Sequence, residues 1–417
     1  MWRHATRPRE DWQDIVTREG LVFPETDLPD GGKVAYWNEA AWYEVTMDEV
    51  LALEAATEQL WEMCVAAVAR MAHDLTDARL GLPPGSLALV RESIRRDEPS
   101  VYGRFDLRFD VDGSIKLLEL NGDTPTGLVE SGVVQWRWLE SELPGSDQWN
   151  SLHERLIERW TDLDRRGALP GHEVHFFYSA AETTGEEEMT VRYMQDTAAQ
   201  AGLLTYAHPI EQVGWNPRLG RFLDRDGRPV RNAFKLYPWE AMLGEEFGQV
   251  LLARHEVEPV RWIEPAWKLM LSTKALLPVL WEMYPGHELL LPSYFDEPRE
   301  LTDWVAKPLH GREGDNIRVH LADGTEQVQP GAYGAEGFVY QQWAPLPRFD
   351  GSHAMIGSWV VDGQAAGMIV RESDGYITDY YSRVVPHAIG DGLAPDLGQQ
   401  LLWRSERAPE RRPTLPE

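Results

Sequence analysis

The 417-residue sequence has one cysteine, Cys64, and no apolar run of the roughly 18 residues that a transmembrane helix needs. A lone cysteine cannot form a disulfide within the chain, and no Cys/His cluster has zinc-site spacing. Cys64 lies in an apolar helical pattern, so we expect a small buried hydrophobe and not the nucleophile of a protease or amidase. Charged residues follow Met1 where a signal peptide would need an apolar core. We therefore expect a cytoplasmic protein with no membrane partner.

Basic residues are also scarce. There are 40 Lys and Arg against 68 Asp and Glu, which gives a net charge of −28. Nucleic acid is not an expected partner, because phosphate binding needs a basic surface. An acidic cleft would attract a cationic ligand such as a polyamine. A well-hydrated acidic surface explains the charge more simply, so charge alone does not identify a ligand.

The length predicts two or three packed lobes, and the 43% hydrophobic share is typical of a globular enzyme. Thr46 and Glu49 have capping-box spacing, which predicts the start of a long amphipathic helix ending near residue 74. Further patterns predict helices near 134–142, 148–163, 190–201 and 272–284, and strands near 173–178, 303–307, 337–343, 354–361 and 365–371. This order favours an α+β or α/β fold. We predict a first portion over 1–255, a second over 256–403 and a charged, Pro-rich tail over 404–417.

Residues 102–121 predict a β-hairpin. Asp112-Gly113 between two alternating runs is a strong signal for a two-residue type I′ turn. If Val111 pairs with Ser114 around this turn, the two strands come into a fixed register. In that register Asp106 lies opposite Glu119, and Arg104 lies opposite Asn121.

Alternation along the two strands then places Arg104, Asp106, Glu119 and Asn121 on one face of the hairpin. The other face, directed to the core, is predicted to hold Phe105, Leu107, Leu118 and Leu120. Carboxylates directly across a ladder repel each other, and a hard cation such as Mg²⁺ with oxygen ligands would explain the pairing. An exposed face neutralised by Arg104 and Arg108 is the alternative, which spacing alone does not exclude. A one-residue bulge would also change the register.

Several motifs occur together and in order along the chain. The hairpin contains Arg104-Phe105-Asp106 and, from 118 to 125, Leu-Glu-Leu-Asn-Gly-Asp-Thr-Pro. Later motifs are Lys-Ala-Leu-Leu-Pro-Val-Leu-Trp at 274–281, Val-Ala-Lys-Pro at 305–308 with Gly-Arg-Glu-Gly at 311–314, and Tyr-Gln-Gln-Trp at 340–343. Together they resemble the glutathionylspermidine synthase family.

This resemblance implies an ATP-grasp-like synthetase fold with an N-terminal pre-ATP-grasp portion. It also implies a ligase that uses ATP and Mg²⁺ to join a glutathione-like acid to a polyamine or another amine through an acyl phosphate. Family members that also hydrolyse the amide carry a cysteine amidase domain before the synthetase. This sequence has no room for that domain, so we expect no hydrolysis.

The resemblance further implies individual roles. Asp106, Glu119 and Asn121 match Mg²⁺ ligands, and Arg104 matches the arginine that steadies the reacting carboxylate. Contacts with ATP are implied for Lys274, Lys307, Gln342 and, near the phosphates, Arg371. Contacts with the substrates are implied for Thr124, Glu187 and Glu188, the last two in a stretch that begins at Glu186.

Lys307 also carries a prediction of its own, because it ends a strand and precedes a loop with Gly311 and Gly314. A lysine there can reach phosphates while the glycines let backbone N–H groups approach, although a plain hairpin loop fits the same residues. Residues 311–316 are the expected lid. A small-molecule kinase and a non-catalytic ATP-grasp-like binding protein remain alternatives. The oligomeric state stays open, with a homodimer as one option.

Overall fold

The computed structural model describes residues 1–254 and 260–392. The first residues of the predicted second portion (256–259), its end (393–403) and the predicted tail (404–417) lie outside the described residues. Within the described ranges, no helix is both long enough and apolar enough to cross a membrane.

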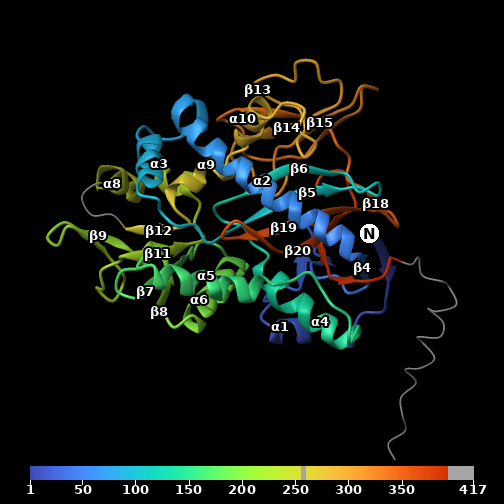
Figure 1. Cartoon of the computed structure of the whole chain (residues 1–417), viewed down its shortest axis with the longest axis horizontal. Helices are drawn as coiled ribbons and strands as arrows, with labels where there is room; N and C mark the ends of the chain where they lie inside the picture. The colour runs from blue at the N-terminus through green and yellow to red at the C-terminus, as the bar shows by residue number, and fades with distance from the viewer. Residues whose placement is uncertain (255–259, 393–417) are drawn as a thin grey trace, which may run out of the picture.

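A six-stranded sheet forms the centre of the molecule, and it joins segments from both halves of the chain (Figure 1). Its order is β21-β20-β19-β5-β6, with β18 paired to β19. The strands are β5 (Tyr102–Phe109), β6 (Ile115–Asn121), β18 (Arg348–Phe349), β19 (Ser352–Val361), β20 (Gln364–Ser373) and β21 (Arg383–Val385). The predicted hairpin is therefore β5–β6, and β19 from the second half of the chain pairs with β5.

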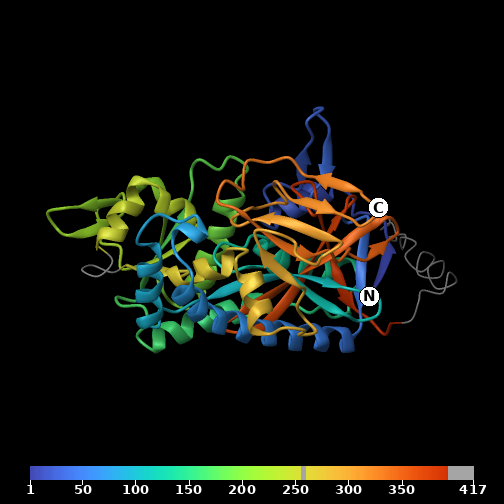
Figure 2. The same ribbon diagram turned by 90° about the horizontal axis from the view of Figure 1, so that it is seen from above.

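Helix α2 (Met47–Asp74) crosses the central sheet, as Figures 1 and 2 show. The predicted capping box is confirmed. Thr46 Oγ1 accepts from the Glu49 backbone N–H at 3.2 Å, and a Glu49 carboxylate oxygen accepts from the Thr46 backbone N–H at 2.9 Å. Cys64 is fully buried on the inner face of this helix, as predicted. Burial raises the pKa of its thiol, so Cys64 contributes packing and not nucleophilic chemistry.

The predicted pairing of β5 with β6 is correct at Arg104 and Asp106, but it arises from a bulge that the sequence did not reveal. Arg104 pairs with Asn121 and Asp106 with Glu119, as predicted. The predicted two-residue turn is wrong, because the Asp110 N–H bonds the Ser114 carbonyl at 3.0 Å and leaves a three-residue loop.

A bulge in β6 restores the predicted pairing of the carboxylates. The register shifts by one residue between Asp106 and Leu107, so Leu107 pairs with Leu117. Leu118 is the extra residue. It leaves the core face on which it was predicted and lines a pocket instead.

A second, parallel sheet follows the order β12-β11-β7-β8. Its strands are β7 (Glu173–Tyr178), β8 (Leu204–Pro209), β11 (Asn232–Lys235) and β12 (Arg261–Ile263), and it packs with α5 (Leu152–Arg165) and α6 (Glu186–Gln200). Helix α6 begins four residues before the predicted start at 190. The three glutamates from Glu186 therefore form its first turn, where the helix dipole favours negative charge.

A third, antiparallel sheet follows the order β13-β17-β14-β15-β16. It consists of β13 (Ser293–Phe295), β14 (Trp304–Pro308), β15 (Arg318–His320), β16 (Glu326–Val328) and β17 (Phe338–Gln342), with α10 (Leu276–Met283) packed against it. The predicted helix from 272 to 284 is instead α9 (Leu269–Ser272) and α10, separated by an extended Thr273. The break arises because the backbone N–H of Lys274 bonds the carbonyl of Leu309 at 2.9 Å.

Smaller elements complete the fold, and the β2–β3 hairpin projects from the side of the molecule opposite α2 (Figure 2). The strands are β1 (Trp2–Ala5), β2 (Glu25–Asp27), β3 (Lys33–Ala35), β4 (Ala41–Val45), β9 (Gly214–Asn216), β10 (Arg221–Leu223) and β22 (His387–Ile389). The helices are α1 (Trp12–Arg18), α3 (Ser86–Arg95), α4 (Gln135–Glu142), α7 (Trp239–Gly244) and α8 (Glu246–Arg254), with short 3₁₀ turns η1 (Ala78–Leu80), η3 (Ile210–Gln212) and η4 (Ala266–Lys268) and a π-helical turn η2 (Glu130–Val134).

Candidate active site

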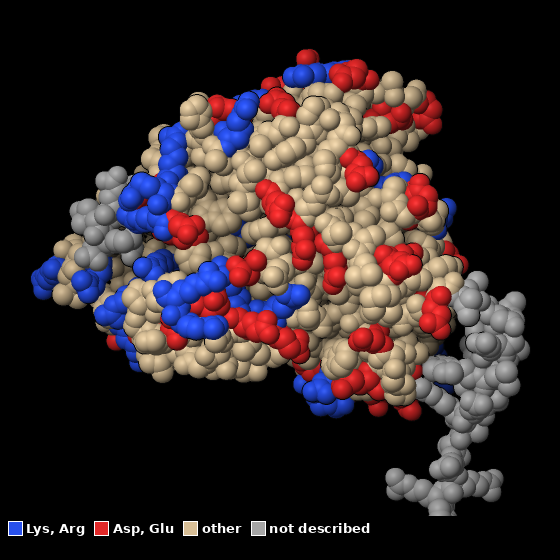
Figure 3. Space-filling model, in the orientation of Figure 1, with Lys and Arg blue, Asp and Glu red and all other residues tan. Residues whose placement is uncertain are grey.

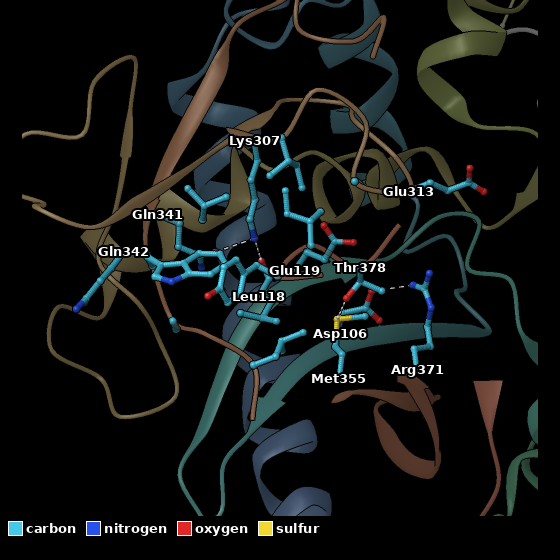
Figure 4. A pocket seen from close by; sticks show the side chains of 18 residues that line it. Asp106, Leu118, Glu119, Lys307, Glu313, Gln341, Gln342, Met355, Arg371 and Thr378 are labelled. Atoms are coloured by element: carbon cyan, nitrogen blue, oxygen red, sulfur yellow. Dashed lines mark hydrogen bonds and ion pairs between the residues drawn. The ribbon is translucent and has the colours of Figure 1, made fainter. Parts of the chain in front are cut away.

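A pocket lies where the central hairpin meets the third sheet, and six of the predicted site residues line it. They are Asp106, Glu119, Lys307, Gln342 and Arg371, together with Gly314 from the predicted lid. Figure 4 shows these side chains from close by. Segments far apart in the sequence, β5, β6, β14, β17 and β20, therefore supply one site.

The Arg104 guanidinium is buried and fully engaged by its neighbours. Nε and Nη2 donate to the two oxygens of Asp106 at 2.9 and 3.3 Å, and Nη1 donates to the Thr126 carbonyl at 2.6 Å. Burial lowers the pKa of Arg104, but the Asp106 carboxylate outweighs it and the net pKa is raised. Arg104 thus holds Asp106 in place. Arg371, whose Nη1 lies 4.0 Å from Asp106 and which lines the pocket, is the arginine better placed to meet an incoming anion.

The three predicted metal ligands converge. Asp106 and Glu119 lie directly opposite on paired strands, and the side-chain amide of Asn121 lies between them. Its Nδ2 donates to Asp106 at 3.2 Å and to Glu119 at 3.3 Å. The amide N–H₂ group occupies the space between two negatively charged carboxylates, which is where a bound cation would lie. Rotation of the amide would direct its oxygen toward such a cation. The donor set therefore fits a hard divalent cation such as Mg²⁺.

Two lysines approach the same carboxylate from the side of the third sheet. Lys274 Nζ lies 3.2 Å from Glu119 and donates to the Gly311 carbonyl at 2.7 Å. Lys307 Nζ donates to the Leu118 carbonyl and to Gln341 Oε1, both at 2.8 Å. Burial raises the pKa of Glu119, but the two ammonium groups outweigh it and lower the net pKa to about 2. Burial lowers the pKa of Lys307 to about 8.

Positive charge is in excess at this site. Four cationic side chains (Arg104, Lys274, Lys307 and Arg371) surround two carboxylates. The chain as a whole carries −28, and the face in Figure 3 shows an acidic band across its middle with most basic groups toward one side. A local surplus of buried positive charge in an acidic protein suits a polyanion such as a triphosphate.

The rest of the pocket is largely apolar and could hold a flat ring. Its lining includes Val305, Ile317, Trp343, Leu346, Met355 and Tyr376. Gln341, not Gln342, directs its side chain inward: Gln341 Nε2 donates to the Leu117 carbonyl at 3.1 Å. The Gln342 side chain is exposed and points away from the centre of the pocket (Figure 4). Alternation with the buried Val339 was the sequence signal for Gln341.

The glycine loop packs against the segment that follows β20. Gly314 has φ 72°, and a Cβ there would lie 2.8 Å from the Thr378 carbonyl. A side chain at this position would push the two segments apart. Gly311 contributes its carbonyl to Lys274, so the loop is fixed at one end by a site lysine.

The three predicted substrate contacts do not line the pocket. Thr124 Oγ1 accepts from Arg312 at 3.1 Å, and Arg312 also pairs with Glu240 at 2.8 Å. Glu187 accepts from the Ser179 backbone N–H at 2.8 Å. Glu188 is exposed and pairs with Arg192 at 3.0 Å. These contacts give the three side chains local structural roles.

Glu186, which sequence reasoning did not single out, is the glutamate of this stretch that faces the site. Burial and the nearby Glu130 raise its pKa to about 7. Glu130 is fully buried and accepts from the Tyr36 hydroxyl at 2.6 Å, and burial raises its pKa as well. The only sequence signal was the acidic run itself, because no local pattern distinguishes Glu186 from its two neighbours.

Comparison with known proteins identifies the family of the chain. The family described as "Glutathionylspermidine synthase preATP-grasp" matches residues 3–390. A Haemophilus influenzae protein named "Putative acid–amine ligase" is 38% identical over 378 residues, covering 88% of this chain and 94% of that protein.

More distant relatives are longer proteins. Trypanothione synthetase of Crithidia fasciculata is 27% identical, over 81% of this chain and 55% of that protein. The bifunctional glutathionylspermidine synthetase/amidase of Escherichia coli is also 27% identical, over 70% of this chain and 50% of that protein. The chain thus spans about half the length of these two relatives.

A solved structure shares the fold. The glutathione synthetase-like effector of Globodera pallida superposes with a TM-score of 0.50 at 9% identity, over 92% of this chain and 98% of that one. The predicted mixed α/β, ATP-grasp-like synthetase fold with a pre-ATP-grasp portion is confirmed.

Proposed function

The chain belongs to the glutathionylspermidine synthase pre-ATP-grasp family, and we propose that it is an ATP-dependent acid–amine ligase that forms an amide through an acyl phosphate. The names of its relatives support a ligase that joins small-molecule acids and amines. By the same names, a glutathione-like acid and a polyamine are the substrates that we propose to test first.

One observation carries the proposal. Asp106, Glu119, Lys307 and Arg371 line a pocket whose far end is apolar. Asn121 and Lys274 contact Glu119 beside this pocket, at 3.3 and 3.2 Å. Carboxylate and amide oxygens suit a divalent cation, the three cationic groups suit phosphates, and the apolar end suits a base.

In the first step, the γ-phosphoryl group of ATP passes to an oxygen of the substrate carboxylate. The bond to the leaving ADP breaks, and an acyl phosphate forms. Arg371 and Lys307 offset the negative charge on the transferring group, and Arg104 keeps the Asp106 carboxylate in the orientation that the site needs. Mg²⁺, held by Asp106, Glu119 and Asn121, would neutralise the phosphate oxygens and fix their geometry.

In the second step, the neutral amine attacks the acyl carbon, phosphate leaves and one proton is released from nitrogen. A group that accepts this proton works best with a pKa near the operating pH. Glu186 has a pKa of about 7 and faces the side of the site that holds Arg371 and Thr126. We therefore assign proton acceptance to Glu186.

A small-molecule kinase would use the same phosphate-binding groups and stop after phosphoryl transfer. The two functions differ in one measurable respect. A kinase releases ADP with the acid alone and gives a phosphorylated product, whereas a ligase gives an amide whose amount depends on the amine. A non-catalytic binding protein would release no ADP in either case.

The test is incubation with ATP, Mg²⁺, glutathione and spermidine, singly and together, with ADP measured and products read by mass spectrometry. The proposal expects an amide only when acid and amine are both present. Asp106→Asn and Glu119→Gln should each lower the rate by about 10²-fold or more, since each removes a charge that the transition state requires. Asp112→Asn, in the exposed loop of the same hairpin, is the matched control and should retain the wild-type rate. Wild-type rates in both site variants would refute the assignment.

A further inference from the structure

A second group of possible metal ligands lies in the parallel sheet, formed by residues outside the catalytic pocket. His208 lies on the edge strand β8, and Asp224 and Asp226 lie in the tight turn that follows β10. One ligand atom from each of these three residues lies within 4.8 Å of the other two. His175, on the neighbouring strand β7, faces Asp224 as well.

The histidines in this group have no hydrogen-bond partners. His175 is fully buried, His208 is 7% exposed, and neither ring nitrogen of either residue has a partner. Buried polar atoms without a partner are uncommon in folded proteins, and an ion is one of the few things that explains them. Here four such nitrogens occur on two adjacent strands, and two of them, one from each histidine, face the buried Asp224 carboxylate.

The distances also suit a bound ion better than hydrogen bonds. His208 Nε2 lies 3.4 Å from Asp224 Oδ2, and His175 Nδ1 lies 3.6 Å from the same oxygen. Both exceed the usual N–H···O distance of about 3.0 Å. Two ligand atoms that share a tetrahedral metal at about 2.0–2.1 Å lie about 3.4 Å apart.

Two arginines already contact the cluster. Arg225 Nε lies 3.6 Å from Asp226, and its side chain is 56% exposed. Arg228 Nη1 lies 2.5 Å from Asp226 and 3.4 Å from Asp224 Oδ2. Its side chain is 44% exposed and stacks on Tyr206, so it can withdraw into solvent without leaving a buried charge. The other oxygen of Asp224 accepts from the backbone N–H groups of Asp226 and Arg228 at 2.9 and 2.8 Å, which fixes the turn and aims Oδ2 at the histidines.

We propose that His208, Asp224 and Asp226 bind one divalent transition-metal ion, with zinc as the best match, and that His175 supports the same oxygen of Asp224 from the neighbouring strand. Imidazole together with carboxylate is a donor set for zinc, whereas Mg²⁺ prefers oxygen ligands alone. The ion would join the turn at 224–228 to the edge strand β8 and so fix a strand that has a neighbour on one side only. The site is independent of the ligase chemistry.

The experiment uses the full chain, purified without a histidine tag, stripped with EDTA and then exposed to Zn²⁺ in the presence of excess Mg²⁺. After desalting, metal is counted by mass spectrometry, and Co²⁺ in place of Zn²⁺ reports tetrahedral coordination through its visible absorption. The expected result is one Zn²⁺ per chain, and a rise in the thermal midpoint on binding. Asp226→Asn, an exposed position, and His208→Gln should each weaken binding at least tenfold.

The control is His172→Gln, which changes an exposed histidine paired with Asp164 near the start of the same sheet. It should bind Zn²⁺ like the wild type. Arg228→Gln should bind at least as tightly as the wild type, because it removes the closer of the two competing cations. If the wild-type chain retains no Zn²⁺, or if Asp226→Asn and His208→Gln bind as tightly as His172→Gln, the proposal is wrong. If His208→Gln does not fold, the Asp226→Asn comparison decides the outcome.

Discussion

Gly357 lies directly opposite Asp106 across the β19–β5 pair, and its missing side chain leaves the space through which Arg104 reaches that carboxylate. A Cβ at Gly357 would lie 2.9 Å from Arg104 Cδ and 2.5 Å from a methyl group of Ile369. The glycine thus belongs to the site without contacting any substrate. Its importance follows from close packing, because the atoms that a Cβ would meet belong to the buried side chains of Ile369 and Arg104.

We expect Gly357→Ala to lower the rate of ADP release at least tenfold. The added methyl group must displace Arg104 or Ile369, and overpacking of this kind costs about 1–3 kcal/mol. A displacement of Arg104 misorients Asp106, and a loss of about 1.4 kcal/mol from the transition state is tenfold in rate. Gly214→Ala, in open space on β9, is the control and should keep the wild-type rate. Equal rates in the two variants, with both folded, would show that Arg104 has room to move.

The loop after the β5–β6 hairpin is tied to the parallel sheet by a fully buried ion pair. Asp123 accepts from Lys235 Nζ at 2.7 Å and from the Trp239 backbone N–H at 2.9 Å. We expect Lys235→Met to lower the free energy of unfolding by about 3–5 kcal/mol, because it leaves a buried carboxylate without its cation. The double variant Lys235→Met with Asp123→Asn removes both charges and should recover most of the loss. Urea denaturation of both variants measures the difference, and equal midpoints would contradict the uncompensated charge as the cause.

Lys307 predicts that ATP binding takes up a proton in mildly alkaline solution. Burial lowers the pKa of its ammonium group to about 8 in the protein without nucleotide. Bound phosphates would raise that pKa, so above pH 8 the lysine gains a proton as ATP binds, and ATP affinity falls by up to about tenfold per pH unit. Below pH 8 the lysine is already charged and no uptake is expected. Calorimetry in two buffers of different ionisation heat measures the proton, and Lys307→Met should abolish it. Proton uptake that persists in that variant would assign the effect to another group.

Because His387 is buried and its pKa is lowered, we expect the protein to lose stability in acid. His387 is fully buried on β22, and burial lowers its pKa from 6.5 to about 3. Between these two pH values, His387 is protonated in the unfolded chain and neutral in the folded chain. The free energy of unfolding therefore falls as the pH drops below 6.5, by up to about 1.4 kcal/mol per pH unit, and is unaffected by this group above it.

His387→Gln tests this, because glutamine can replace the contact with Gln135 Oε1 at 3.0 Å and does not titrate. Urea unfolding is measured at neutral pH and at two values below 6.5. The free energy of unfolding should change less steeply with pH in the variant than in the wild type. The same slope in both proteins would place the acid sensitivity elsewhere.

The predicted grouping of three oxygen-bearing side chains is confirmed because it used information that is local in sequence. Alternation along two strands joined by a short loop places Asp106, Glu119 and Asn121 on one face whatever the rest of the chain does. Even so, two errors cancelled. The loop holds one residue more than predicted, the bulge at Leu118 absorbs the difference, and no pattern in the hairpin reveals either feature.

The directions of the Glu186, Glu187 and Glu188 side chains could not be predicted from the sequence in the same way. Glu187 and Glu188 are the neighbours of Glu186 on one helical turn, and successive residues of a helix point about 100° apart. Which of the three lies near Glu130 and Arg371 depends on how α6 packs against β7 and on the position of the Glu130 turn. Those contacts are made by residues far apart in the chain.

The sequence by itself determined the elements whose causes are local: the capped helix α2, the buried Cys64, and a hairpin with oxygen ligands on one face. Only the tertiary structure decided that Lys274 pairs with Glu119 and that Lys307 bonds the inward-turned Gln341 side chain. It also decided that the Arg104 guanidinium bonds Asp106. The physical reason is the separation along the chain over which each interaction acts. Capping and alternation act over a few residues, whereas charge pairing and burial depend on which distant segments the packed core brings together.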